Sequence, residues 1–167
     1  MKYPEEIIFN SDEFVMLDIG SVADLIEISK KNKRRRARIC AHNSEEDKLH
    51  EMFIVHEKDT YVRPHKHINK TESFHLIHGK IRVIIFNDDG VIKKAIEMGE
   101  YRKGNPFFYR IGTDVYHTLQ ILSEFAVFHE TTNGPFIREN TIWADWAPKE
   151  NDLNEIEKFM SNLEHDR

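Results

Sequence analysis

The sequence predicts an all-β domain, an antiparallel barrel, with one helix before it and one after it. Between residues 51 and 130, short β-branched and aromatic runs are separated by turn residues, a pattern typical of antiparallel β architectures. Apolar residues follow helical spacing near both ends of the chain. A length of 167 residues favours one domain. We divide it into N-terminal strands, a helix and a basic segment (1–50), a barrel core (51–136), and a C-terminal segment and helix (137–167).

The first fifty residues are expected to form an entry element. Residues 7–9 and 14–17 are short apolar runs around a turn, which predicts two small strands. Ser21 is expected to cap a helix that fades into a basic run at residues 30–38. Two interpretations of this run stay open. It could bind a phosphate or diphosphate through arginine forks, or it could be a solvated helix end, which we favour.

The core region contains one clear hairpin and several further strands. Residues 81–86 and 91–98 flank Asn87-Asp88-Asp89-Gly90, where Gly90 can adopt the positive φ that such a loop needs. Further strands are expected at residues 52–55, 60–64, 73–77, 107–111, 117–122 and 125–130.

A second helix is expected near the C-terminus. Asp152 and Glu155 can form a capping box, and the apolar residues that follow share one helical face. We expect this amphipathic helix to pack on the outside of the barrel.

The histidine-rich stretch near residue 65 is the most informative part of the sequence. On a strand, alternate side chains share a face, so His65 and His67 can reach one ion, with Tyr61 and Arg63 beside them. Glu72 lies five residues beyond His67, so the chain must turn before this carboxylate can return to the same centre. We therefore predict a metal site here, with Tyr61 and Arg63 as candidate catalytic or anion-binding residues.

His117, which opens a later apolar strand, is the predicted fourth ligand. Three neutral imidazoles and one carboxylate would leave a divalent ion with positive charge and open coordination positions. The alternative is acid–base chemistry by the histidines without a metal. His129 could orient a ligand, although a plain structural hydrogen bond is favoured. The remaining histidines are expected mostly at the surface or in turns.

These residues resemble the two motifs of the cupin family. His65-x-His67-x4-Glu72-x6-Gly79 resembles the first motif, and the segment from Gly104 through Gly112 to His117 resembles the second. The departures are Asp59 at a usual glycine, Arg110 at a usual proline, Ile121 at a usual asparagine and two extra residues before His117. The resemblance implies an RmlC-like jelly-roll barrel with one divalent ion, zinc, iron, manganese or nickel.

A narrower resemblance is to the WbuC family of cupin-fold metalloproteins, over roughly residues 22–150. It is carried by the arginine-rich segment before Cys40-Ala41-His42, by Tyr61-Val62-Arg63-Pro64-His65-Lys66-His67 and by Asn87-Asp88-Asp89-Gly90. Three later stretches add to it: His129-Glu130, Gly134-Pro135-Phe136 and Trp146-Ala147-Pro148. The resemblance implies a setting among genes for surface-polysaccharide and O-antigen synthesis.

Three functions follow as expectations. The first is a metal-dependent isomerase or epimerase whose small-molecule substrate is a sugar nucleotide. The second is an Fe(II)-dependent dioxygenase, and the third is a non-catalytic module that binds or senses a sugar. A fold supports many functions, so these stay open.

Composition limits the partners and the compartment. A formal net charge of −5 argues against general binding to nucleic acid or to anionic membranes. The single cysteine, Cys40, has no intramolecular partner, and no run approaches the roughly 18 apolar residues of a membrane span. The first residues lack a secretory pattern. We expect a cytoplasmic protein and, as with many cupins, a homodimer.

Overall fold

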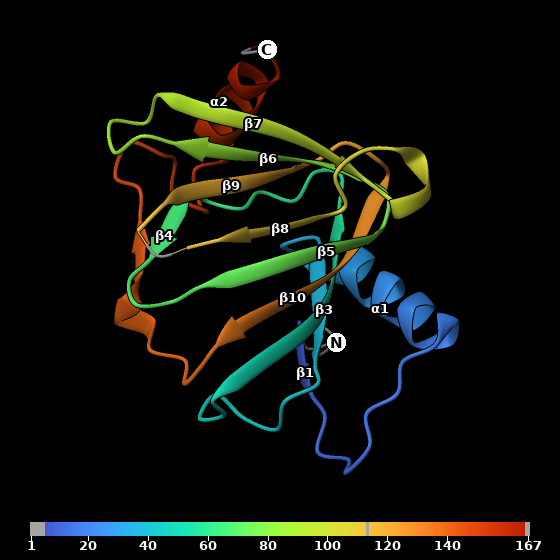
Figure 1. Cartoon of the computed structure of the whole chain (residues 1–167). Helices are drawn as coiled ribbons and strands as arrows, with labels where there is room; N and C mark the ends of the chain where they lie inside the picture. Colours follow the sequence, from blue (N-terminus) through green and yellow to red (C-terminus); the bar gives the residue numbers. More distant parts are fainter. Residues whose placement is uncertain (1–5, 113, 166–167) are drawn as a thin grey trace.

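The strands form two sheets that face each other (Figure 1). The computed structural model describes residues 6–112 and 114–165, with side chains described up to residue 163. In spatial order, the six-stranded sheet contains β1 (Ile7–Phe9), β2 (Arg36–Cys40), β3 (Leu49–Glu57), β10 (Phe125–Asn133), β5 (Glu72–His78) and β8 (Phe108–Ile111). The five-stranded sheet contains β11 (Thr141–Trp143), β4 (His65–His67), β9 (Tyr116–Ile121), β6 (Lys80–Phe86) and β7 (Ile92–Gly99).

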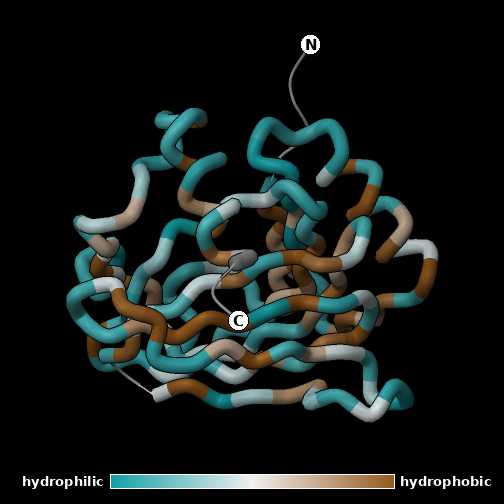
Figure 2. Tube along the Cα trace, turned by 90° about the horizontal axis from the view of Figure 1, so that it is seen from above, coloured by the Kyte–Doolittle hydropathy of each residue, from teal (hydrophilic) through white to brown (hydrophobic). Residues whose placement is uncertain are grey.

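The predicted closed barrel is therefore replaced by an open sandwich. Among the described residues, no strand of one sheet is hydrogen-bonded to a strand of the other. The chain passes from β5 to β6, and so from sheet to sheet, at Gly79, whose φ is 94°. Figure 2 shows short polar and apolar segments alternating around the molecule, as expected of strands with two different faces.

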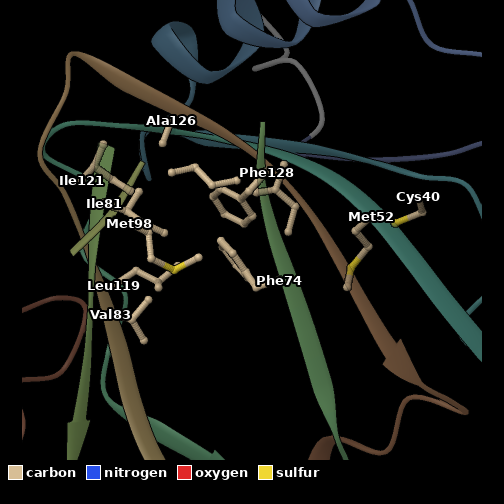
Figure 3. Packing of buried hydrophobic residues seen from close by; sticks show 12 residues of the cluster. Cys40, Met52, Phe74, Ile81, Val83, Met98, Leu119, Ile121, Ala126 and Phe128 are labelled. Atoms are coloured by element: carbon tan, nitrogen blue, oxygen red, sulfur yellow. The ribbon is translucent and has the colours of Figure 1, made fainter. Parts of the chain in front are cut away.

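The main hydrophobic core fills part of the space between the two sheets (Figure 3). The six-stranded sheet contributes Phe74, Leu76 and Phe128, and the five-stranded sheet contributes Val83 and Leu119. Phe74 and Phe128 stack with ring centroids 4.1 Å apart. This packing fixes the spacing of the sheets beside the polar residues described below.

The outer face of each sheet is covered by one helix. Helix α1 (Ile19–Lys31) packs through Leu25 on the six-stranded sheet, at Val55 and Val127. Helix α2 (Leu153–His165) packs through Leu163 on Ile84 and Phe86 of β6. The two helices lie at different sides of the molecule (Figure 1). None of the helices that the structure describes has the length and apolar content needed to span a bilayer.

The N-terminal region differs from the prediction in three respects. Residues 14–17 form no strand, and Phe14 and Met16 are exposed. Asp18, not Ser21, is the N-cap of α1, and it accepts a 2.9 Å hydrogen bond from the Ser21 N–H. The basic run leaves the helix at Lys31 and becomes β2, which pairs parallel with β1 across the α1 crossover.

Two further differences concern strands. Residues 60–64 form no strand, so β4 begins only at His65, and β11 was not predicted. Two short 3₁₀ helices, η1 (Tyr101–Lys103) and η2 (Arg138–Asn140), also occur. The predicted hairpin between β6 and β7 is confirmed, with Gly90 at a φ of 85°.

Gly90 also allows a close approach by Trp146. A Cβ atom at residue 90 would lie 2.8 Å from the Trp146 ring, whereas a Cβ at Gly104, which has a similar positive φ, would meet nothing within 4 Å. We expect Gly104→Ala to lower the free energy of unfolding by about 1–2 kcal/mol through backbone strain. Gly90→Ala should lower it by roughly 1–3 kcal/mol more through overpacking. Urea denaturation measures both, and equal losses would show that the tryptophan contact is unimportant.

Three histidines that were expected at the surface are buried: His42, His50 and His56. His56 on β3 meets Phe128 edge-on with ring centroids 5.1 Å apart. Burial, with a smaller effect of nearby arginines, lowers the pKa of His56 from 6.5 to about 3. The folded protein therefore holds this imidazole neutral.

The neutral state of His56 predicts acid sensitivity. Its folded pKa lies below its unfolded pKa, so its contribution to stability is complete above pH 6.5 and is lost as the pH falls toward 3. Between pH 7.5 and 5, His56→Gln should lose less stability than the native chain, by about 2 kcal/mol. The exposed His75→Gln is the matched control. Chemical denaturation at both pH values measures the free energy of unfolding. An equal loss of stability between the two pH values in all three proteins would contradict a buried, neutral His56.

Candidate metal centre

The predicted ligands come from three strands on both sheets. His65 and His67 lie on β4, and His117 lies directly opposite His65 on the neighbouring strand β9. The chain then turns at Asn69, which has a φ of 57°, and crosses to the other sheet, where Glu72 begins β5. The turn that the sequence required thus returns the carboxylate to the histidines.

The four side chains converge in the structure. The ligand nitrogens of His65, His67 and His117 all lie within 4.8 Å of one another. The Glu72 carboxylate lies 3.0 Å from Nε2 of His117 and 3.5 Å from Nε2 of His67. This set of imidazoles and a carboxylate is one that first-row divalent ions accept.

Hydrogen bonds at Nδ1 orient the imidazole rings so that Nε2 faces the centre of the cluster. Nδ1 of His65 lies 2.8 Å from the Arg63 carbonyl oxygen, and Nδ1 of His117 lies 2.9 Å from the Val115 carbonyl oxygen. A carbonyl can only accept, so Nδ1 of His65 and of His117 each carry a proton, and Nε2 is the ring atom left to face a metal ion or the Glu72 carboxylate. Nδ1 of His67 lies 3.2 Å from the Thr141 hydroxyl, which can accept in the same way. The donor set therefore fits a divalent ion.

The charges of the cluster act differently on its members. Burial, with the charges of His117 and His67, lowers the pKa of His65 to about 3, so this imidazole is neutral. Burial by itself would raise the pKa of Glu72, but the charge of His117 and hydrogen bonds from His117 and His67 lower it well below its usual value. Burial by itself would lower the pKa of His117, but the charge of Glu72 and the hydrogen bond to it raise that pKa, so His117 is favoured as an imidazolium that donates to Glu72.

The cluster lines a cavity of about 700 Å³ between the sheets. The described lining also includes Tyr109 on β8 and Glu130 on β10. The Tyr109 ring stacks on Phe74 with centroids 5.2 Å apart, and Glu130 is opposite Phe74 across the β10–β5 pair. The cavity thus places a phenol and a second carboxyl beside Glu72.

Sequence reasoning missed Glu130 and considered its neighbour His129 instead. His129 stacks on Phe53 at 4.6 Å, and its Nε2 lies 3.7 Å from Glu51. Successive residues of a strand point to opposite faces, so the buried Phe128 could have indicated that Glu130, and not His129, faces the interior. No comparable signal in the sequence identified Tyr109.

Arg63 and Tyr61 take different positions because they precede β4. Arg63 lines the cavity, donates to the Ala144 carbonyl at 2.7 Å and lies 6.0 Å from the Trp143 ring centroid. The Tyr61 hydroxyl donates to the Pro148 carbonyl at 2.8 Å, and Tyr61 is not among the described residues of the cavity lining. Tyr61 therefore anchors the C-terminal segment.

The basic run reaches the cavity, which the favoured interpretation did not foresee. Lys30 and Lys31 do end the helix α1. Arg34, Arg36 and Arg38, however, line the cavity, the last two as part of β2. A solvated helix end thus describes only the start of this run.

Sequence comparison provides one match. A family described as a domain of unknown function (DUF6016) matches residues 17–98, just under half of the chain. No curated protein sequence matches. The matched segment includes the basic run, β4 and the three ligands that precede residue 98.

Structural comparison identifies the fold. Protein SO0799 of Shewanella oneidensis aligns with a TM-score of 0.57 and 9% identity, over 77% of this chain and 85% of that chain. The capsular polysaccharide assembling protein CapF of Staphylococcus aureus aligns with a TM-score of 0.50 and 15% identity, over 65% of this chain and 29% of that chain. The cupin domain of Schizosaccharomyces pombe Cnp3 aligns with a TM-score of 0.47 and 12% identity, over 60% of this chain and 66% of that chain.

These likenesses concern the fold. All identities are below 25%, and the chain spans less than a third of several of the solved chains that it matches, CapF among them. The WbuC type remains a resemblance of sequence. The two sheets make the structure a β-sandwich, a fold that it shares with SO0799 and CapF, with a histidine cluster that could hold a metal ion.

Proposed function

We propose that this chain is a metal-dependent enzyme of surface-polysaccharide metabolism that isomerises or epimerises a small substrate such as a sugar nucleotide. One observation carries the proposal: three histidines and Glu72 converge inside a cavity of about 700 Å³. Cavities of this size suit small molecules, and convergent polar groups within one are typical of an active site.

The ion would be held by His65, His67, His117 and Glu72. A divalent ion in such a site acts as a Lewis acid that polarises a carbonyl or hydroxyl of the substrate. Imidazole and carboxylate accept zinc, iron, manganese and nickel, so the donor set does not choose among them. The open part of the cavity leaves room for a substrate beside the ligands.

Proton transfer is assigned to the residues next to the ligands. Burial and the charge of Glu72 raise the pKa of Tyr109, so its phenol stays protonated and can donate a hydrogen bond. Glu130 lies in one row with Tyr109 across the inner face of the six-stranded sheet, because both are opposite Phe74 on β5. As a carboxylate, Glu130 can accept a proton from a substrate carbon. Arg63, which precedes β4, lines the same cavity and can contact a substrate oxygen.

The polysaccharide setting has separate support. The resemblance to the WbuC family supplies it, and CapF is a solved protein of similar fold whose name places it in capsular polysaccharide assembly. At 15% identity, that likeness supports a scaffold suited to such substrates and does not choose the reaction.

Metal content tests the centre. We expect about one metal ion per chain in protein purified without a nickel affinity step, and less than about a tenth of this in the double variant His65→Ala, His67→Ala, because half of the ligands are removed. The control is His75→Ala, which removes an exposed histidine from β5. Elemental analysis and circular dichroism measure metal and fold together. A folded double variant with full metal content would refute the site.

Hydrogen exchange with solvent tests the reaction. In heavy water, an isomerase or epimerase should add about one mass unit to its substrate as a carbon-bound proton is replaced. We expect mass spectrometry of a panel of nucleotide sugars to show this with the native chain, and not with Glu130→Gln loaded with the same metal. Oxygen consumption without such exchange would instead indicate the dioxygenase, and binding without either would indicate a sugar-binding module.

A further inference from the structure

The cavity is rich in basic side chains although the chain is acidic. Among the described residues, its lining contains seven arginines and lysines against five glutamates, whereas the whole chain has a net charge of −5. The basic residues are Arg34, Arg36, Arg38, Arg63, Lys70, Arg138 and Lys149. Positive charge concentrated in a low-dielectric cleft attracts anions.

Two of these cations already have anionic partners. Arg34 lies 3.2 Å from Glu6 and 2.5 Å from Glu150, and Arg36 lies 2.7 Å from Glu6. These pairs tie β2 to the segments around it, and their charges largely cancel. Their role is therefore to build the cavity wall.

Arg38 and Lys70 lack such partners. Among the described residues, neither forms an ion pair within 4.0 Å, and the buried Nε of Arg38 has no hydrogen-bond partner. The Lys70 ammonium lies over the Phe136 ring, 5.5 Å from its centroid. Both side chains are half-buried, and a half-buried cation that lacks an ion-pair partner can be completed by an anionic ligand.

The two cations line the same cavity as Glu130. Arg38 reaches it from β2, and Lys70 reaches it from the turn that precedes β5. Neither contacts Glu130 within 4.0 Å in the described structure. The cavity of about 700 Å³ that they line is large enough to admit an anion beside them.

We propose that Arg38 and Lys70 form an anion subsite that binds the phosphate or diphosphate group of the substrate. An arginine fork with a nearby ammonium suits the several oxygens of a phosphate. The substrate would then span the cavity, with its anionic group at this subsite and its reacting carbon at the histidines. This inference rests on the proposed function, because it names the substrate class of the same cavity.

Inorganic pyrophosphate is the probe for this subsite. Isothermal titration of the full chain at constant ionic strength should show binding that weakens roughly tenfold or more in Arg38→Gln and in Lys70→Gln, because each removes a charge-assisted hydrogen bond. The matched controls are Arg102→Gln and Lys94→Gln, which remove exposed cations outside the cavity lining. These should bind within about twofold of the native chain. If Arg38→Gln does not fold, the affinity of Lys70→Gln for pyrophosphate tests the subsite by itself, because Lys70 lies in a turn outside the strands.

The double variant His65→Ala, His67→Ala separates this inference from the metal. Retained pyrophosphate affinity in that variant supports a subsite at Arg38 and Lys70, whatever the outcome for the metal. Affinity that is lost in the double variant but unchanged in Arg38→Gln and Lys70→Gln would place the anion on the metal and overturn the subsite. Absence of binding to the native chain at millimolar pyrophosphate would overturn it as well.

Discussion

The burial of the Glu72 carboxylate is the constraint on which the cavity depends. A carboxylate removed from water is stable only with compensating partners, and here these are Nε2 of His117 at 3.0 Å and Nε2 of His67 at 3.5 Å. Because Glu72 belongs to one sheet and the histidines to the other, this contact joins the two layers. The turn at Asn69 and the pairing of His65 with His117 both serve the same junction.

Strands β5 and β9 each carry a polar residue of the cluster at one end and apolar core residues farther along. On β5, Glu72 faces the ligands, whereas Phe74 and Leu76 belong to the hydrophobic core. On β9, His117 is followed on the same face by Leu119 in that core. The core therefore holds the ligands in place directly, through the backbones of the strands that carry them. Rigid strands of this kind position a site more accurately than loops do.

The sequence predicted most strands of the core and the convergence of His65, His67, Glu72 and His117, because alternation and turn residues are local signals. It did not predict β2, where an arginine-rich run becomes a strand only because β1 and β3 lie beside it. Local spacing also put Tyr61 and Arg63 on one strand with His65, although the backbone there is irregular. Glu130 was missed because its place in the cavity depends on which face of β10 turns inward, a tertiary property.

The position of β2 has a consequence for how such proteins can diverge. The ligand residues lie between His65 and His117, but Arg38 reaches the cavity from a unit of β1, α1 and β2 that precedes them all. That unit adds an edge to the sheet and carries no ligand. A change of charge within this unit would alter one wall of the cavity without replacing any of the four clustered residues, whereas Lys70 lies between two of them. The charge of that wall can therefore vary separately from the histidine cluster.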